Sequence, residues 1–137
     1  MSVTTRVADT SDLAFLAGAD THLTPERLAD LVAVGRVLVG VVDGDVVGFL
    51  RWGLFWDLVP FMNLLWVLPE RRGTGVGTAL VDAWEGAQHA AGHDLVLTST
   101  MSHERSQHLY RRLGYVDSGA LLLPGEPAEL ILRKSLA

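Results

Sequence analysis

Three glycines at alternate positions, Gly73, Gly75 and Gly77, constrain the fold of this chain more than any other feature. Glycine loses more conformational freedom on folding than any other residue, so such a run is expected where bare backbone is needed. An almost wholly apolar segment, residues 61–67, precedes the run, and an amphipathic segment, residues 76–91, follows it. This order indicates a central strand, buried on both faces, that leads through a tight turn into a helix.

The segment after the glycines has the spacing of a helix that packs one face against a sheet. Its apolar face comprises Val76, Leu80, Trp84, Ala87 and Ala91, and its polar face carries Asp82, Glu85 and His89. We expect the polar face to lie in solvent and Gly92 to end the helix.

A helix that begins at a glycine turn is a suitable place for an anion such as a pyrophosphate. The first N–H groups of a helix have no partner inside it, and the helix dipole favours negative charge there. Arg71 and Arg72 stand directly before the glycines and add positive charge. The sequence matches neither the P-loop nor the G-x-G-x-x-G/A pattern of dinucleotide-binding folds. A turn that only joins the strand to the helix is the alternative.

The remaining segments alternate between patterns typical of strands and of helices. Strands are expected at 3–8, in a hairpin at 36–55 around Asp43-Gly44, and at 94–100, 115–123 and 128–136, with a turn at 57–60. Helices are expected from a cap at Ser11-Asp12 to Ala17, from Thr24-Pro25 to Gly35, and from a cap at Ser102 or His103 to Gly114. The order β-α-α-β-β-β-α-β-α-β-β predicts a mixed α+β fold. Its fourth and fifth strands are expected to be parallel because a helix joins them.

Length and composition exclude several classes of protein. The 137 residues fit one domain, residues 1–137, and the net charge of −5 argues against a nucleic-acid binder. The chain has no cysteine, which excludes a disulfide framework, a thiolate metal site and a cysteine nucleophile. His89 and His93 have no evident third ligand, so no metal is expected. No apolar run reaches the roughly 18 residues of a membrane span, and no signal peptide is evident, so we expect a cytoplasmic protein without a membrane partner.

Two motifs resemble signatures of the GNAT superfamily of acyl-CoA-dependent N-acyltransferases. Arg72-x-x-Gly75-x-Gly77 is similar to the family pattern Q/R-x-x-G-x-G/A, and the flanking VLPERRGTGVGTAL resembles its usual setting. The segment SQHLYRRLGY, residues 106–115, resembles the second signature, A-x-x-L-Y-x-x-x-G-F/Y. The resemblance implies a mixed, mostly antiparallel sheet of about seven strands with flanking helices, in which strands 4 and 5 splay apart.

The resemblance also implies a site for acetyl-CoA as co-substrate. The backbone of Leu65, Trp66 and Val67 would pair with the pantetheine arm, as an added strand does. The pyrophosphate would be held by Arg72, Gly73, Thr74, Gly75, Val76, Gly77 and Thr78. Tyr110 matches the general acid that protonates the leaving thiolate, and a backbone N–H of strand 4 would stabilise the oxyanion. His103 stands where members often carry an asparagine, and it could cap a helix or contact the cofactor.

The general base is missing from its expected place. Many family members carry a carboxylate on strand 4 that takes a proton from the amine, and segment 61–67 has none. A primary amine with a pKa near ~10 must lose a proton before it attacks. Asp57, His22, Glu26, Asp117 and a water chain are all open as the base, and a weakly basic acceptor would need none.

The function that the resemblance implies is N-acetyl transfer from acetyl-CoA to an amine by direct attack. The missing carboxylate motivates the alternative of an acyl-CoA-binding sensor or interaction module with little catalysis, and a structural dimer subunit is a third hypothesis. The acceptor is open among polyamines, aminoglycosides, amino acids and protein N-termini, and a homodimer is expected. Four aromatic side chains near the turn at 57–60 could line an acceptor pocket or fill a core or dimer contact: Trp52, Phe55, Trp56 and Phe61.

Overall fold

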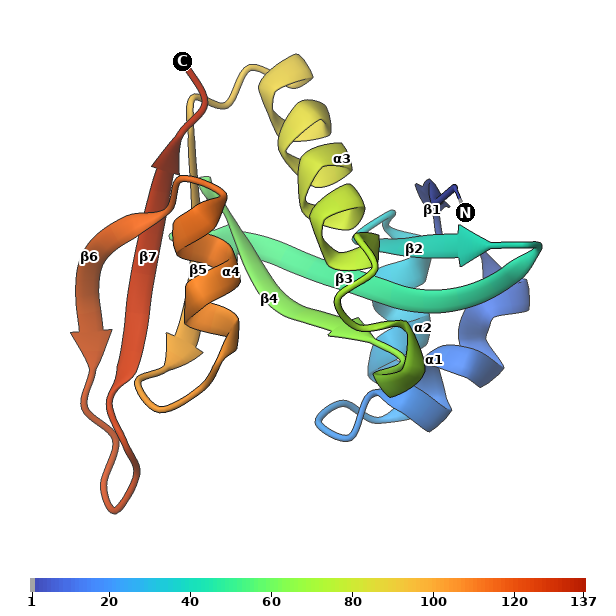
Figure 1. Ribbon diagram of the computed structural model, residues 1–137, viewed down its shortest axis with the longest axis horizontal. Helices are drawn as coiled ribbons and strands as arrows, with labels where there is room; N and C mark the ends of the chain where they lie inside the picture. The colour runs from blue at the N-terminus through green and yellow to red at the C-terminus, as the bar shows by residue number, and fades with distance from the viewer. Residues whose placement is uncertain (1) are drawn as a thin grey trace. The chain divides into compact units, whose positions relative to one another are not determined.

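The computed structural model describes residues 2–137. Seven strands form one sheet in the order β1-β2-β3-β4-β5-β7-β6 (Figure 1). The strands are β1 (Thr4–Val7), β2 (Val37–Val42), β3 (Asp45–Phe55), β4 (Val59–Val67), β5 (Leu95–Met101), β6 (Val116–Leu121) and β7 (Glu129–Ser135). The helices are α1 (Leu13–Ala19), α2 (Pro25–Ala33), α3 (Val76–Ala90) and α4 (Ser106–Arg112), with short 3-10 turns η1 (Thr10–Asp12) and η2 (Pro69–Arg71).

The predicted fold class is confirmed. The sheet is mostly antiparallel, with antiparallel ladders between β1 and β2, β2 and β3, β5 and β7, and β6 and β7. β4 and β5 are parallel, and their ladder joins Phe61 to Leu97 and Met62 to Thr98. The sequence did not predict that β7 would lie between β5 and β6, because the alternation of residues within a strand does not specify its neighbours.

The chain forms two compact units. The N-terminal unit comprises the described residues up to Trp52 together with Leu64–Trp84. The C-terminal unit comprises Gly53–Asn63 and Glu85–Ala137.

The N-terminal unit has its core between β1–β3 and the helices α1 and α2. The buried residues of this core are Ala8, Leu16, Leu28, Val32, Val37, Val39 and Phe49. Figure 1 shows α1 and α2 on one face of β2 and β3 and the first turns of α3 on the other face. Thr24 caps α2 by accepting a hydrogen bond from the Arg27 N–H, with Pro25 as the first helical residue, as expected.

Two facing glycines bring the start of α3 close to the sheet. Gly40 of β2 and Gly48 of β3 are direct partners in the ladder. A Cβ atom on Gly40 would lie 3.1 Å from Val76 Cγ1, and one on Gly48 would lie 3.2 Å from the same atom and 2.8 Å from the Trp66 carbonyl oxygen. Val76, the first residue of α3, is 1% exposed. The two glycines therefore form the hollow that receives the beginning of the helix.

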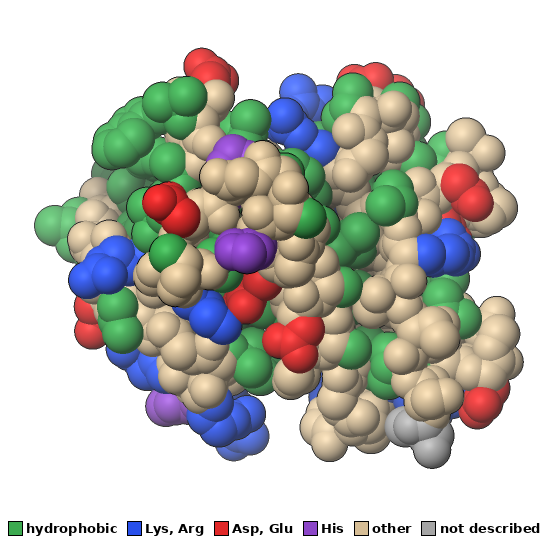
Figure 2. All heavy atoms as spheres, turned by 90° about the horizontal axis from the view of Figure 1, so that it is seen from above, with side chains coloured by type: hydrophobic (Ala, Val, Ile, Leu, Met, Phe, Trp, Pro, Cys, Tyr) green, Lys and Arg blue, Asp and Glu red, His purple; other side chains and the backbone are tan. Residues whose placement is uncertain are grey.

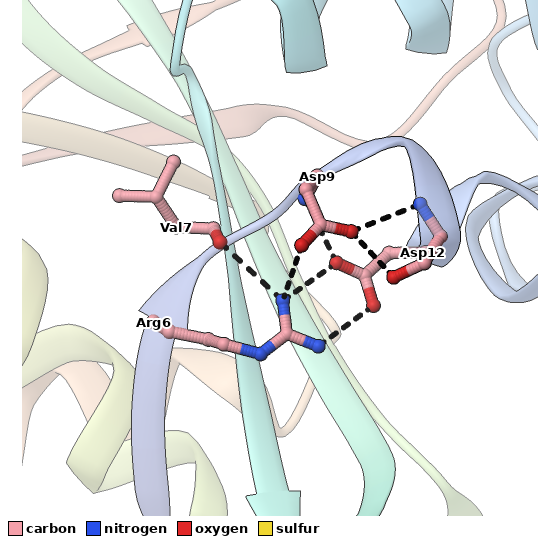
Figure 3. Close-up of polar contacts among 5 residues, drawn as sticks. Arg6, Val7, Asp9 and Asp12 are labelled. Atoms are coloured by element: carbon pink, nitrogen blue, oxygen red, sulfur yellow. Dashed lines mark hydrogen bonds and ion pairs between the residues drawn. The ribbon is translucent and has the colours of Figure 1, made fainter.

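The expected cap of the first helix is wrong. Asp9, rather than Ser11 or Asp12, caps the chain here, through a capping box with Asp12 at the start of η1, and α1 continues to Ala19. The Asp12 carboxylate cannot cap α1 because it accepts hydrogen bonds from both terminal nitrogens of Arg6, at 2.7 and 2.9 Å, and from the Asp9 N–H at 2.9 Å (Figure 3). Arg6 thereby ties β1 to the first helical turn.

The hairpin at Asp43-Gly44 is confirmed, but the next turn lies earlier than expected. Asp43 and Gly44 have φ angles of 51° and 84°. The second turn is centred on Trp56 and Asp57, with φ angles of 58° and 60°, and the Leu58 N–H donates to the Phe55 carbonyl at 3.0 Å. Two successive left-handed residues match the twist of the flanking strands, so β4 begins at Val59 and includes Pro60.

β4 is not buried on both faces along its length, contrary to expectation. Pro60 and Met62 are buried, Asn63 is exposed, and residues 64–67 are half-buried. Of the two residues that pair with β5, Met62 is buried and Phe61 is half-buried. The apolar composition of the second half therefore does not reflect full burial.

The expected polar face of α3 is also partly wrong. On the expected apolar face, Ala87 and Ala91 are both exposed, whereas Gln88, which was not assigned to it, is buried. The Glu85 side chain, expected in solvent, is only 11% exposed because it accepts hydrogen bonds from Tyr115 Oη at 2.9 Å and from Lys134 Nζ at 2.8 Å. A carboxylate with two donors in place can occupy a buried helix face that periodicity assigns to water.

The C-terminal unit packs α4 against β5, and its outer strand β6 is exposed along its length. Neither Ser102 nor His103 caps α4, because the loop after β5 is longer than expected and the helix begins at Ser106. Gln107 Nε2 instead donates to the Ser102 carbonyl at 2.8 Å. Figure 2 shows hydrophobic side chains gathered on the side where Figure 1 draws β6 and β7. Leu122, just after β6, is 83% exposed.

Within residues 2–137, no helix combines the length and the apolar character needed to cross a membrane.

We predict that Gly48→Ala destabilises the fold. The added methyl would lie 2.8 Å from the Trp66 carbonyl oxygen, so strand backbone must shift. We expect a loss of about 1–3 kcal/mol in the free energy of unfolding, measured by urea denaturation. Gly86→Ala is the matched control, since it lies inside α3 and a Cβ added there would meet no atom within 4 Å. That control should be neutral or stabilising by up to about 1 kcal/mol; equal losses in both would contradict the close approach at Gly48.

We also predict an acid-dependent contribution from the Arg6–Asp12 pair. The hydrogen bonds from Arg6 lower the pKa of the Asp12 carboxyl, although burial opposes them. A lowered pKa stabilises the fold above the unfolded-state pKa of about 3.9, and this stabilisation is lost as the pH falls through the folded-state pKa. Asp12→Asn should cost about 1 kcal/mol at pH 7, because Arg6 is 42% exposed, and should flatten the loss of stability below pH ~4. Asp30→Asn on the exposed side of α2 is the control, and an unchanged acid limb in Asp12→Asn would refute the assignment.

Candidate active site

The glycine turn presents an open helix start, as the sequence predicts. Gly73 and Gly75 have φ angles of 77° and 95°, which side-chain-bearing residues rarely adopt. No atom lies within 4 Å of a Cβ built on either glycine, and residues 72–75 are exposed. The first hydrogen bond of α3 runs from the Ala79 N–H to the Gly75 carbonyl. The N–H groups of Val76, Gly77 and Thr78 therefore precede the helical ladder, at the positive end of the helix dipole.

Arg72 connects this turn to the end of β4. Its Nε donates to the Val67 carbonyl at 2.9 Å, which fixes the first part of an otherwise exposed side chain. Thr74 Oγ1 closes the turn by donating to the Arg71 carbonyl. The guanidinium of Arg72 thus stays beside the exposed glycines, where a charge-assisted contact with an anion is geometrically available.

The second half of β4 is held from one side by aromatic rings. The Trp66 ring lies 6.0 Å from the Phe15 ring of α1 and 6.0 Å from the Phe49 ring of β3. Leu65, Trp66 and Val67 are only half-buried, so this stretch is ordered without being enclosed. These residues and those of the glycine turn all belong to the N-terminal unit.

Tyr110 lies in the C-terminal unit, on α4, and is 5% exposed. Burial raises the pKa of its hydroxyl to about 12, the nearby Glu104 charge adds to the rise, and a hydrogen bond with the Thr98 side chain opposes it. Thr98 itself donates to the Met62 carbonyl at 3.0 Å. A phenol in this setting stays protonated across the physiological pH range and can act as an acid but not as a base.

Sequence reasoning missed Thr98 and Glu104 as neighbours of Tyr110. The signal was present for Thr98, because the polar side chains at 98 and 100 alternate within an apolar strand and are both buried. Thr100 Oγ1 lies 2.8 Å from Ser106 Oγ in the first turn of α4. Nothing in the sequence pattern placed Glu104, whose Oε1 accepts from the Met101 N–H at 3.1 Å. His103 lies in the same loop and is exposed.

The four residues considered as bases have different surroundings. Asp117 pairs with Arg111 at 2.9 Å, and this hydrogen bond lowers its pKa. Asp57 occupies the left-handed turn before β4, and Glu26 lies exposed in the first turn of α2. His22 Nδ1 lies 3.8 Å from the carboxylate of Asp20.

The ion pair between Asp20 and Arg51 was not predicted. Arg51 Nε donates to Asp20 Oδ2 at 2.7 Å, and the Arg51 and Asp20 side chains are 10% and 0% exposed. The sequence contains one indication of this pair. Arg51 lies in the middle of an apolar strand segment, and an arginine there requires a partner if it is buried.

The four aromatic residues do not form one group. Trp52 lies in the N-terminal unit, where its ring is 6.4 Å from that of Trp84 and 5.2 Å from the Arg36 guanidinium. In the C-terminal unit, the Phe55 ring lies 4.7 Å from that of Trp56 and 6.0 Å from that of Phe61. Trp52 therefore packs against other side chains, as expected for a residue that fills a core. Trp56 is 75% exposed and does not fill a core.

Across the described chain, residues 2–137, no three histidine, aspartate or glutamate side chains are grouped so that they could hold a metal ion.

Solved structures share this fold over nearly the whole chain. Ard1 from Thermoplasma volcanium is 19% identical with a TM-score of 0.88, covering 100% of this chain and 99% of that one. yncA from Salmonella typhimurium, solved with its cofactor acetyl-CoA, is 17% identical with a TM-score of 0.81, covering 100% and 95%. The ribosomal-protein-S18-alanine N-acetyltransferase from Escherichia coli is 15% identical with a TM-score of 0.80, covering 99% and 95%.

No curated protein sequence matches the chain. The family model of the acetyltransferase (GNAT) domain matches residues 33–117, which include the glycine turn, β5 and α4. This match spans more than half of the 137 residues, and with the shared fold it shows that the chain belongs to the GNAT acetyltransferase family.

Proposed function

We propose that the protein transfers an acetyl group from acetyl-CoA to the nitrogen of an amine by direct attack. Membership of the GNAT family supports an acyltransferase. The observation that carries the proposal is the exposed glycine turn at the start of α3, with free space at Gly73 and Gly75 and Arg72 held beside it. Nitrogen as the acceptor atom has support from the Escherichia coli relative, which is named as an alanine N-acetyltransferase.

Acetyl-CoA is proposed to bind to residues whose chemistry matches its groups. The N–H groups of residues 73–78 and the Arg72 guanidinium suit a pyrophosphate, because they combine bare backbone, a helix start and positive charge. The backbone of Leu65, Trp66 and Val67 would pair with the pantetheine arm as an added strand does. His103, in the loop after β5, is proposed to contact the cofactor as well.

Tyr110 is assigned as the acid. Acetyl-CoA supplies an activated acetyl group, and the attacking nitrogen displaces a thiolate that needs a proton. A phenol with a pKa of about 12 is fully protonated at neutral pH and can give that proton. A strand-4 backbone N–H would stabilise the negative charge on the carbonyl oxygen.

The acceptor is open among polyamines, aminoglycosides, amino acids and protein N-termini. We also propose that the protein is cytoplasmic and forms a homodimer. The exposed side chains of Leu121, Leu122 and Leu123 offer apolar surface for such a contact.

We predict that calorimetric titration with acetyl-CoA shows one-site binding. Arg72→Ala should weaken it about 10- to 100-fold, since a hydrogen bond to a charged group contributes about 1.5–3 kcal/mol. Gly75→Ala should weaken it as well, because a side chain at a φ of 95° strains the turn. Arg27→Ala, which removes an exposed positive charge from α2, is the matched control and should bind normally. Undetectable binding in folded protein would make the turn a structural feature.

We predict that Tyr110→Phe lowers kcat about 100-fold with the dissociation constant for acetyl-CoA unchanged. Thiol release can be followed with a thiol reagent free of protein background, because the chain has no cysteine. Tyr115→Phe is the matched control: it removes the other tyrosine hydroxyl, which binds Glu85. Because the pKa of Tyr110 is raised, wild-type kcat should show no loss between pH ~8 and ~10 from ionisation of the acid. Turnover that survives Tyr110→Phe would remove Tyr110 from the mechanism.

Acetyl-CoA binding without thiol release across the four amine classes would favour the alternative, an acyl-CoA-binding sensor with little catalysis.

A further inference from the structure

One proton transfer in the proposed reaction has no residue assigned to it. An alkylamine is an ammonium ion at neutral pH, and its nitrogen has no lone pair for attack until one proton leaves. No residue of β4, Val59–Val67, carries a carboxylate. Tyr110 cannot take this proton, because its raised pKa keeps the hydroxyl protonated.

Three of the four candidate bases are carboxylates. Asp117 is bound to Arg111, which stabilises its charge and lowers its pKa. Stabilising its anion weakens Asp117 as a base. Glu26 lies exposed in the first turn of α2. Asp57 lies at the tip of the hairpin between β3 and β4, in the C-terminal unit.

His22 has a different environment, because a buried carboxylate organises its loop. Asp20 Oδ1 accepts hydrogen bonds from the backbone N–H groups of His22 at 2.9 Å and of Leu23 at 3.2 Å. Asp20 Oδ2 accepts from Arg51 Nε at 2.7 Å. The carboxylate is therefore fixed between β3 and the loop that joins α1 to α2, and the His22 Nδ1 lies 3.8 Å from Oδ1.

This loop and the second half of β4 pack on the same hydrophobic core within the N-terminal unit. Leu23, next to His22, packs on the same hydrophobic core as Leu64 and Trp66. Arg51 is two residues from Phe49, so both side chains lie on one face of β3, and the Phe49 ring lies 6.0 Å from that of Trp66. His22 thus belongs to a loop that shares one core with Leu64 and Trp66, next to and within the proposed thioester-binding stretch, residues 65–67.

We propose that His22 is the general base of the transfer and that Asp20 is its positioning residue. This inference rests on the proposed function. The imidazole takes one proton from the ammonium group: an N–H bond of the substrate breaks, an N–H bond of the ring forms, and the freed electron pair attacks the thioester carbonyl. Asp20 positions the ring because its carboxylate holds the backbone N–H groups of His22 and Leu23 and lies 3.8 Å from His22 Nδ1.

The exposure of the two side chains matches these roles. His22 is 70% exposed, so the proton can pass from the ring to water after each turnover. Asp20 is 0% exposed, and although burial acts to raise its pKa, the hydrogen bonds from Arg51 and from the loop backbone lower it overall. The partner of the imidazole therefore remains an anion.

The test compares two acceptors of equal size and different basicity. One is the alkylamine R–CH2–NH2 that gives the highest rate in the panel, and the other is the alkoxyamine R–O–NH2, which is neutral at pH 7 and needs no base. We expect His22→Gln to lower kcat/KM about 100- to 1000-fold for the alkylamine and less than about threefold for the alkoxyamine. Asp20→Asn should lower the alkylamine rate about tenfold and spare the alkoxyamine.

Two controls accompany these variants. His89→Gln removes an exposed histidine from α3 and should leave both rates unchanged. Glu26→Gln removes the other candidate base of the N-terminal unit. Acetyl-CoA titration of every variant checks that the fold and the binding of the co-substrate are intact.

Each outcome decides the inference. Equal losses for both acceptors would give His22 a structural role only, and unchanged alkylamine turnover would exclude it as the base. A selective alkylamine loss in Glu26→Gln would transfer the role to Glu26. Absence of thiol release from wild-type protein with every amine would refute the proposed function itself, and with it this inference.

Discussion

The close approach of α3 to the sheet is the constraint on which the N-terminal unit depends. Gly40 and Gly48 face each other across β2 and β3, and the side chain of Val76 occupies the space that two Cβ atoms would fill. Because Val76 is the first residue of α3, this contact fixes where the helix starts and therefore where its free N–H groups point. The left-handed Gly73 and Gly75 then let the chain reach that point from the end of β4. An anion site built from backbone needs this kind of rigid support, since no side chain can compensate for a misplaced helix start.

Buried carboxylates organise the segments that periodicity does not. Asp12 joins β1 to the first helical turn, Asp20 joins the loop after α1 to β3, and Glu85 joins α3 to β7. In each case a cationic side chain and at least one further donor satisfy the carboxylate, which is the condition for placing a charge away from water. Burial of such pairs adds little to stability compared with apolar packing, but removal of one partner is costly. Their effect is therefore to specify one arrangement of loops that would otherwise have several.

The sequence predicted most of the architecture and only part of the environment of the proposed site. The glycine run, the Asp43-Gly44 turn and the Thr24-Pro25 cap are local signals, and each formed where it was expected because neighbouring residues alone decide it. Glu85 was misplaced because periodicity reports the average polarity of a face and not the partners that arrive from distant strands. The order β5-β7-β6 and the Asp20–Arg51 pair depend on contacts between residues far apart in the chain, which no short pattern encodes. The second half of β4 was predicted to be buried because its residues are apolar. An apolar sequence does not distinguish a fully buried strand from a half-buried one, which residues 64–67 are.

The proton inventory of acyl transfer explains why an acid and a base of opposite exposure suit this chemistry. An ammonium acceptor loses two protons on its way to an amide, while the leaving thiolate gains one, so one proton must reach solvent in each turnover. The group that takes the first proton must therefore exchange with water, and the proposed base, His22, is 70% exposed. The group that protonates sulfur can be recharged by the nitrogen itself when the amide forms, so it needs no path to solvent, and Tyr110 is 5% exposed with a pKa of about 12. Exchanging the two settings would be unfavourable for both groups. Burial would disfavour the charged imidazolium that a histidine base must form, and an exposed phenol would lose part of its protonated form at alkaline pH.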